Sequence, residues 1–317
     1  MTQTNAAPVY TKATRTKSKA PGAQPTPAVA QRAPAFRIET HKVRQRYLKL
    51  LIYGSPGVGK TSLAGSAVEV PSMRDVLMIN AELGDLAIED LDIDSIPLES
   101  YAKVQQILQF LKNHIKLRLE GNVDKLRELQ AMFFRVPVEV VQEGGEDEVD
   151  DDDNFTRLRL RHYRTLIIDS LTELELQCFE MIMQFEGAAL DELPDKTEWD
   201  DYGSKNTMIL RLLRGFRDLP VHTIYTCADK TILIGRAKTP KQTLDLTGQL
   251  AGKAQGVMDM VGRLVMRPSD EGPAERHLLV MPDKLGGYDA KHRYSRFQGN
   301  SFVNPSLAQI LQEVGLA

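Results

Sequence analysis

Residues 54–61 read Gly-Ser-Pro-Gly-Val-Gly-Lys-Thr, which matches the phosphate-binding pattern G-x-x-x-x-G-K-[ST] in full. The apolar segment 47–53 before it predicts a buried strand, and residues 62–68 predict a helix. Glycines leave the backbone N–H groups of such a loop free to surround a phosphate, because no side chain obstructs them. A strand, this loop and a helix in that order predict an α/β fold that binds a nucleoside triphosphate.

The residue types of the loop indicate how the triphosphate would be held. We expect Lys60 to place its ammonium on the β and γ phosphates and Thr61 to ligate magnesium through its hydroxyl. ATP and Mg²⁺ are therefore the expected cofactors. The expected nucleotide-binding residues are Gly54, Ser55, Pro56, Gly57, Val58, Gly59, Lys60, Thr61 and Ser62.

Composition narrows the class of protein. The 317 residues are 42% hydrophobic and 26% charged, as in ordinary globular proteins. Cys178 and Cys227 are the only cysteines, and their spacing argues against a disulfide framework or a zinc site. No apolar run of about 18 residues occurs, so we expect no membrane span. A cytoplasmic protein is therefore expected.

Two segments look unsuited to packing. Residues 1–40 are rich in Ala, Pro and Thr and basic up to Arg37, which predicts a disordered basic tail. Residues 143–153 carry eight acidic side chains and no base, which predicts a mobile acidic loop at about 143–154. The basic segment 157–161 that follows could neutralise that loop. The rest of 41–317 is enough for one ATPase domain.

The core alternates between strand and helix patterns. Apolar runs predict strands at 76–80, 165–169 and 221–226, with paired strands at 263–267 and 277–281. Helical periodicity predicts helices at 101–119, 171–185, 207–216 and 305–314. Ser170 and Glu173 form a capping box at the start of one of them. This order predicts a mostly parallel central sheet flanked by helices.

Asp169 ends the apolar strand 165–169, about a hundred residues after the phosphate-binding loop. A carboxylate at the carboxyl end of a neighbouring parallel strand points into the crevice that holds the metal. We therefore expect Asp169 to share the Mg²⁺ with Thr61.

The segment 166–171, Leu-Ile-Ile-Asp-Ser-Leu, resembles the Walker B strand of the RecA-like ATPases, in which Asp-Ser follows the strand. It does not resemble the Asp-Glu ending of AAA+ motors. In RecA-like proteins the catalytic glutamate ends the strand beside the phosphate-binding loop, and segment 79–82, Ile-Asn-Ala-Glu, is similar to it. The resemblance implies that Glu82 orients the attacking water.

Lys291 and Arg293 resemble the Lys-x-Arg pair of RecA-like ring ATPases of the DnaB and KaiC kind. In those proteins the pair reaches the γ-phosphate of a neighbouring subunit and stabilises the charge of the transferring phosphoryl group. The resemblance implies a homo-oligomer, ring or filament, whose active sites lie between subunits.

Smaller matches point to one branch of this class. Residues 199–203, 246–253 and 258–261, with Arg276, resemble phage-encoded RecA-like nucleotide-binding proteins, including the Sak-type single-strand annealing ATPases. The resemblance covers about 48–293. It implies a DNA-stimulated ATPase that binds single-stranded DNA, supports recombination or annealing, and works beside a single-strand binding protein.

One departure concerns the sensing of the γ-phosphate. RecA recombinases end their fourth strand in a Gln, whereas residues 226–229 here read Thr-Cys-Ala-Asp, so Thr226 or Asp229 would replace that sensor. The segment after this strand is where RecA-like proteins place a mobile DNA-binding loop. Its basic residues could neutralise phosphates without reading bases. These candidate DNA contacts are Lys230, Arg236, Lys238, Lys241 and Lys253.

Three alternative functions remain open. A ring helicase or translocase motor would separate strands directionally. A nucleotide-gated module would bind ATP to assemble on DNA or protein with little turnover. A small-molecule kinase would transfer phosphate to a nucleoside and would not respond to DNA.

Overall fold

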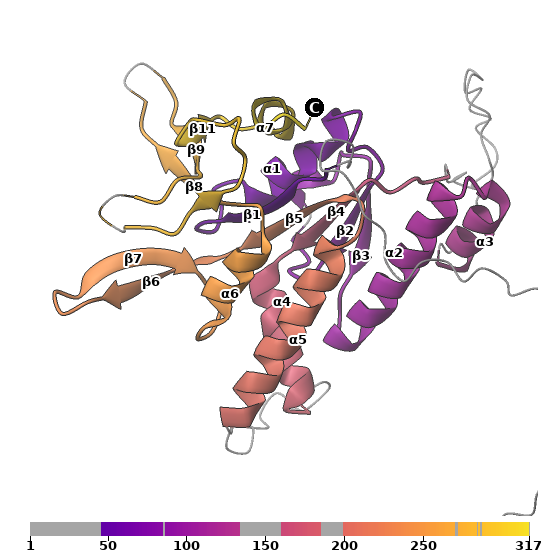
Figure 1. Ribbon diagram of the computed structural model, residues 1–317, viewed down its shortest axis with the longest axis horizontal. Helices are drawn as coiled ribbons and strands as arrows, with labels where there is room; N and C mark the ends of the chain where they lie inside the picture. Colours follow the sequence, from indigo (N-terminus) through magenta and orange to yellow (C-terminus); the bar gives the residue numbers. More distant parts are fainter. Residues whose placement is uncertain are drawn as a thin grey trace, which may run out of the picture. The chain divides into compact units, whose positions relative to one another are not determined.

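The computed structural model describes residues 46–84, 86–133, 160–184, 199–269, 272–283, 285 and 287–316. Six neighbouring strands of its main sheet run parallel, and the loop at 54–59 follows strand β1 near the middle (Figure 1). In order across the sheet these are β3 (Ile93–Pro97), β2 (Val76–Asn80), β4 (Thr165–Asp169), β5 (His222–Cys227), β1 (Lys49–Tyr53) and β8 (Met260–Arg267).

Three short antiparallel strands extend the sheet beyond β8. Strands β9 and β10 both pair with β8, and β11 pairs with β9. A separate two-stranded ribbon, β6–β7, projects from the carboxyl side of β5 (Figure 1). The bounds are β6 (Asp229–Ile234), β7 (Thr239–Leu244), β9 (Glu275–Leu279), β10 (Lys291–His292) and β11 (Ser301–Val303).

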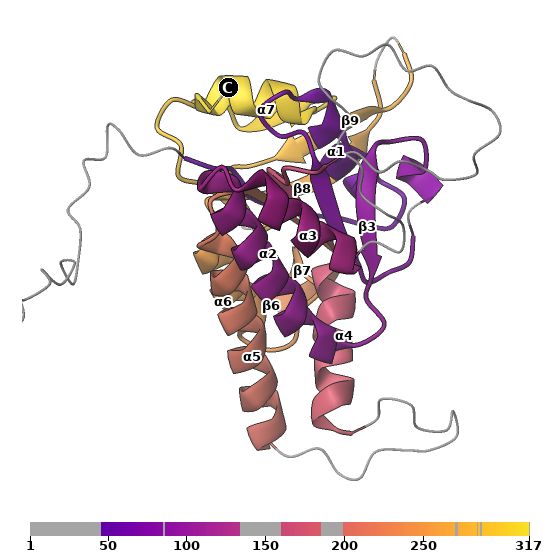
Figure 2. The ribbon, with the colours of Figure 1, turned by 90° about the vertical axis from the view of Figure 1, so that its right-hand side faces the viewer.

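Helices cover both faces of the sheet, as two separate groups of buried side chains show. Helices α1 and α7 pack on one face, and α2, α4, α5 and α6 pack on the other (Figure 2). Their bounds are α1 (Lys60–Gly65), α2 (Val104–Leu119), α3 (Val123–Phe133), α4 (Leu171–Ile182), α5 (Trp199–Arg217), α6 (Leu250–Val257) and α7 (Leu307–Val314). Short 3-10 turns lie at η1 (Ser66–Glu69), η2 (Leu86–Ile88) and η3 (Tyr101–Lys103). The predicted α/β class with a mostly parallel central sheet is confirmed.

The sequence pattern missed helices α3 and α6, and it also missed or misplaced several partly exposed elements. Strand β3 lies at the edge and carries Asp94 and Ser95, so it lacks the apolar run of the central strands. The ribbon β6–β7 was expected as a loop, but its two strands pair with each other along their whole length, and many of their residues are exposed. Helix α5 begins eight residues before its predicted start at 207, because its polar first turns show no apolar period.

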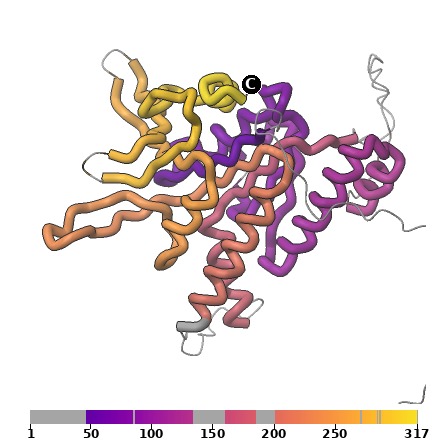
Figure 3. Tube along the Cα trace, viewed as in Figure 1, coloured from indigo at the N-terminus to yellow at the C-terminus, as the bar shows by residue number. Residues whose placement is uncertain are grey.

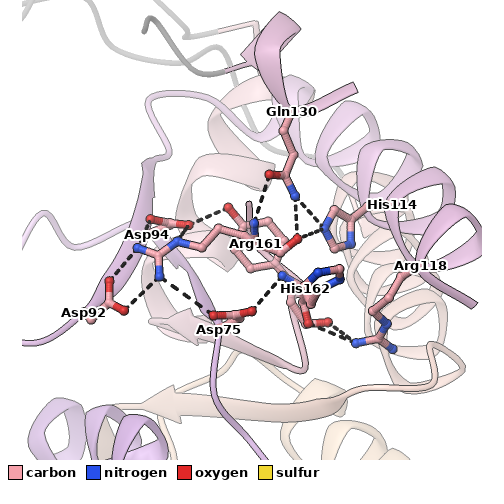
Figure 4. Close-up of polar contacts among 9 residues, drawn as sticks. Asp75, Asp92, Asp94, His114, Arg118, Gln130, Arg161 and His162 are labelled. Carbon is pink, nitrogen blue, oxygen red and sulfur yellow. Dashed lines mark hydrogen bonds and ion pairs between the residues drawn. The ribbon is translucent and has the colours of Figure 1, made fainter. Parts of the chain in front are cut away.

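Arg161 is held in a polar cluster between the sheet and helices α2 and α3 (Figure 4). Its guanidinium donates to Asp92 at 2.8 Å, and its ion pairs with Asp94 and Asp75 measure 3.1 and 3.8 Å. Only 10% of this side chain is exposed, so the three carboxylates compensate the buried charge. Residues 157–159 of the basic segment lie outside the described residues. The predicted tail at 1–40 and the acidic loop at about 143–154 lie outside the described residues.

Two further findings bear on the class of protein. Both cysteines are free and buried. Within the described ranges, no helix has the length and the apolar character that crossing a membrane would need.

His222 begins β5 and is buried as a neutral side chain. Its Nδ1 accepts the backbone N–H of Leu48 at 3.1 Å, which requires an unprotonated nitrogen. Burial, with a smaller effect of Lys49, lowers the pKa of His222 to about 4. The unfolded chain therefore takes up this proton at higher pH than the folded chain does, and stability falls as the pH drops from about 6.5 towards 4.

We expect His222→Asn to reduce this loss, because the Asn carbonyl can accept the Leu48 N–H but does not titrate. The histidine contributes a loss of up to about 3 kcal/mol across that window. Urea unfolding at pH 7.5, 6, 5 and 4.5 measures the free energy of both proteins. His114, whose pKa burial also lowers to about 4, is present in both and cancels. Equal pH slopes for the two proteins would contradict the assignment.

Candidate active site

The loop between β1 and α1 has the backbone that a phosphate cradle needs. Gly57 and Gly59 adopt φ angles of 79° and 90°, a left-handed conformation that residues other than glycine rarely adopt. A Cβ at Gly54 would lie 2.4 Å from the carbonyl oxygen of Leu264, so this position must remain glycine. Gly59 is the N-terminal cap of α1, and no side chain bonds the helix there. The first N–H groups of α1 therefore remain available to an anion.

Lys60 lies across this loop. Its ammonium donates to the carbonyl oxygens of Gly54 at 2.9 Å and Ser55 at 3.1 Å. Within the described ranges it pairs with no carboxylate. The charge therefore lies over the cradle and can turn to a phosphate at the cost of two hydrogen bonds to partly exposed carbonyl groups.

Asp169 connects three parts of the site at the carboxyl end of β4. Its carboxylate accepts the Thr61 hydroxyl at 2.7 Å and also the Thr226 hydroxyl. Asp169 is buried, and burial raises the pKa of its carboxyl group, while both hydroxyls oppose that shift. The structure thus brings together the two residues expected to share Mg²⁺, although 108 positions separate them in the chain.

The donor set around Asp169 fits a magnesium ion. The Thr61 hydroxyl and the Asp169 carboxylate are oxygen ligands of the kind that Mg²⁺ prefers. Asn80 ends β2 directly beside Asp169 in the sheet register, and its Oδ1 is buried without a hydrogen-bond partner among the described residues. Among the described residues, no group of three or more His, Cys, Asp or Glu side chains could hold a metal ion. Such a site holds Mg²⁺ together with phosphates rather than alone.

The Glu82 side chain is exposed beside the site, and hydrogen bonds hold both its carboxylate and its backbone in place. Its carboxylate accepts the Ser170 hydroxyl. The backbone N–H groups of Ala81 and Glu82 both donate to the carbonyl oxygen of Asp169, at 2.6 and 3.2 Å. The side chain of Ser170 also caps α4 by accepting the N–H of Glu173. The segment after β2 is therefore pinned to the end of β4, with Glu82 next to Asp169.

Lys291 and Arg293 lie away from the loop of their own chain. Strand β10 pairs with β8 at Met260 and Val261, and Arg293 forms an ion pair with Asp259 at 3.3 Å. Asp259 lies beside Lys49, the first residue of β1, because its N–H donates to the Lys49 carbonyl oxygen. Arg293 is therefore near the amino end of β1, whereas the phosphate-binding loop follows the carboxyl end of that strand. Five strand residues span about 16 Å. Burial, and then Arg293, lowers the pKa of Lys291.

The ribbon β6–β7 extends away from the sheet (Figure 3), and its first residue contacts the phosphate-binding loop. Asp229, its first residue, accepts the Ser55 hydroxyl at 3.0 Å and pairs with Arg263 of β8 at 3.1 Å. Thr226 and Asp229, the two expected replacements for the missing Gln, thus contact Asp169 and Ser55 respectively.

The five candidate DNA contacts fall into two groups. Lys230 pairs with Asp245 at 3.4 Å, and Lys241 pairs with Asp289 at 2.6 Å, so both help to hold the ribbon. Arg236 and Lys238 are exposed in the turn of the ribbon, and Lys253 is exposed on α6. The strand before the turn also exposes apolar side chains, namely Ile232, Leu233 and Ile234.

The pattern of residues did not single out Asn80 or Arg263. Asn80 stood within the segment compared with the catalytic-glutamate strand, but an unpaired carbonyl becomes visible only when its neighbours are known. Arg263 stood in a predicted strand, and its pairing with Asp229 depends on which strand lies beside β1.

Together, the loop, Lys60, Thr61 and Asp169 at the carboxyl edge of a mostly parallel sheet define a P-loop NTPase. A family model described as AAA domain matches residues 46–294, so the chain belongs to the AAA domain family. A search of curated proteins found no match.

Three solved structures are similar to this chain at low identity. The flagellar accessory protein FlaH from Methanocaldococcus jannaschii has 11% identity and a TM-score of 0.34, with 81% of this chain and 85% of that chain covered. The RadB recombinase has 10% identity and a TM-score of 0.37, with coverages of 81% and 86%. A KaiC-like protein from Pyrococcus horikoshii OT3 has 13% identity and a TM-score of 0.33, with coverages of 81% and 89%.

Proposed function

We propose that this protein is an ATPase that binds single-stranded DNA and supports recombination or strand annealing of the phage type. The observation that carries the proposal is the contact between Ser55 of the phosphate-binding loop and Asp229 at the root of the ribbon. This hydrogen bond joins the nucleotide site to an exposed element with cations and apolar side chains at its end. Such a combination suits sequence-neutral contact with phosphates and bases.

The chemistry would be divided among residues at the ends of the parallel strands. Lys60 and the loop N–H groups bind the phosphates of ATP, while Thr61 and Asp169 hold Mg²⁺. Bound Mg²⁺ neutralises charge on the phosphate oxygens. Glu82 lies beside this position and accepts a hydrogen bond, so it can orient a water molecule for attack.

Lys291 and Arg293 would complete the site of a neighbouring copy. Their place near the amino end of β1 keeps them from the loop of their own chain, which agrees with action across a subunit boundary. A homo-oligomer, working beside a single-strand binding protein, is part of the proposal.

A nucleotide-gated binding module with little turnover is the second candidate. The observation that favours it is the bond between Thr226 and Asp169, because a hydroxyl group stands where a longer amide side chain would sense the γ-phosphate. Its signature would be ATP-dependent DNA binding by a wild-type protein that releases almost no phosphate. A ring helicase or translocase would instead show directional strand separation.

An ATPase titration with single-stranded DNA at several salt concentrations tests the proposal. We expect DNA to stimulate phosphate release by the wild type, with binding that weakens as salt rises. Replacing Arg236 and Lys238 together by Gln should weaken DNA binding and lower the salt slope by roughly one per cation that contacts a phosphate.

The matched control replaces Lys112 and Lys116 by Gln, since both are exposed cations on α2. That variant should bind DNA like the wild type. Lys60→Ala should abolish hydrolysis, and this loss would show that the released phosphate comes from this site. A wild type that neither binds DNA nor responds to it at low salt would refute the proposed function.

A further inference from the structure

Arg276 of β9 reaches the phosphate-binding loop from outside the parallel strands. A Cβ built on Gly59 would lie 2.8 Å from Nη1 of Arg276 and 3.5 Å from its Cδ. The side chain thus lies against the residue at which the loop enters α1, although it comes from a strand 217 residues later. Glycine at this position provides the left-handed φ and also the space for the guanidinium.

The backbone of Arg276 is fixed relative to the loop. Its N–H donates to Oδ1 of Asn304 at 3.0 Å, and its carbonyl oxygen accepts the N–H of Asn304 at 2.6 Å. Two residues further on, Ser306 caps α7, and the N–H of Leu307 donates to the Ser66 hydroxyl at 3.2 Å. Since Ser66 directly follows α1, this segment ties β9 to the helix that begins at the loop.

The charge of Arg276 is not compensated within the described part of the chain. Its guanidinium forms no ion pair and no side-chain hydrogen bond there, whereas Arg161, Arg263 and Arg293 each pair with an aspartate. A partly buried guanidinium with five donors normally finds an anion. Lys60 is a second cation at the same loop that has no carboxylate partner among the described residues.

We propose that Arg276 binds the phosphates of the nucleotide held by the loop of the same chain. This inference rests on the proposed nucleotide binding and adds a second cation, from outside the P-loop motif. Arg276 is thereby a binding residue of the site, and its charge favours di- and triphosphates over less charged ligands. It acts within one subunit, unlike the part proposed for Lys291 and Arg293.

Nucleotide affinity and turnover of Arg276→Gln test the inference. We expect the Kd of ADP and of ATP to rise about 10-fold or more, and KM for ATP to rise with it, while kcat changes by less than about threefold. Arg276→Lys keeps the charge and should retain most of the affinity. Because a phosphate contact is ionic, the Kd of Arg276→Gln should also depend less on salt than that of the wild type.

Arg267→Gln is the matched control. Arg267 is exposed on β8, next to β9, and opposes Glu275, the neighbour of Arg276, so the variant removes the same charge nearby. It should bind nucleotide like the wild type. If Arg276→Gln and Arg267→Gln bind nucleotide equally well and the wild type binds ATP, the inference about Arg276 is overturned but the proposed function is not. A wild type that binds no nucleotide would overturn the proposed function as well.

Thermal unfolding separates binding from packing. If Arg276 only fills space beside Gly59, Arg276→Gln should lower the Tm without nucleotide, and Arg276→Lys should bind as weakly as Arg276→Gln does. That outcome would overturn the inference even if the affinity fell. The inference predicts instead that Tm without nucleotide is nearly unchanged and that the upward shift of Tm by ADP is reduced.

Discussion

Replacement of Glu82 by Gln is expected to lower steady-state phosphate release by about 100- to 1000-fold, while ATP binding stays within about twofold of the wild type. Gln has the same length and can remain hydrogen-bonded to the Ser170 hydroxyl, so the segment after β2 keeps its place. It lacks the carboxylate that would orient and polarise the attacking water. Phosphate release under saturating ATP and equilibrium binding of ATP measure the two effects separately.

Glu89→Gln is the control for this prediction. Glu89 is also exposed and lies seven residues further along the chain, close to η2. Its replacement changes the net charge equally and should leave turnover unchanged. Hydrolysis by Glu82→Gln at more than a tenth of the wild-type rate would exclude Glu82 as the group that positions water.

Replacement of Asp169 by Asn should have the second large effect, on the dependence of turnover on Mg²⁺. The amide cannot provide the anionic ligand, and one of its polar atoms becomes a donor facing the hydroxyl of Thr61 or Thr226. We expect the Mg²⁺ concentration for half-maximal hydrolysis to rise by about 100-fold or more. Hydrolysis measured against Mg²⁺ at fixed ATP, with Asp218→Asn as an exposed control, decides the outcome.

The pH profile provides a further check on Asp169. Burial raises the pKa of this carboxyl group, so it takes up a proton at a higher pH than an exposed aspartate does. A protonated carboxyl is a poor metal ligand, and turnover should therefore fall on the acidic side. Added Mg²⁺ should shift that fall to lower pH. A profile on which Mg²⁺ has no effect would contradict the assignment of Asp169 as a ligand.

The parts of the fold that the sequence predicted are those whose signal is local. Strands β1, β2, β4 and β5 are fully buried runs and were all expected, because both faces of a parallel sheet are covered. The ribbon β6–β7 was expected as a loop, because its strands lack the long buried apolar run of the central strands and are held by pairing with each other. Edge strand β3 and the polar first turns of α5 were missed for the same reason.

The candidate site divides in the same way. Asp169 beside Thr61 could be expected, because both follow from the rule that parallel strands present their carboxyl ends at one edge. The bond between Ser55 and Asp229 and the approach of Arg276 to Gly59 could not. They depend on the order of β9, β8, β1 and β5 across the sheet, which no single segment encodes.

The opposite placement of the P-loop and Arg293 along β1 has a consequence for symmetry. If Arg293 acts in a second copy, the surface that gives and the surface that receives are different patches of one subunit, so the contact is heterologous. Such a contact has a direction and repeats from copy to copy. The assembly closes into a ring when the rotation between copies divides a full turn. Otherwise it continues as a helix, and the nucleotide site at one end is then not completed by the Arg293 of a neighbour.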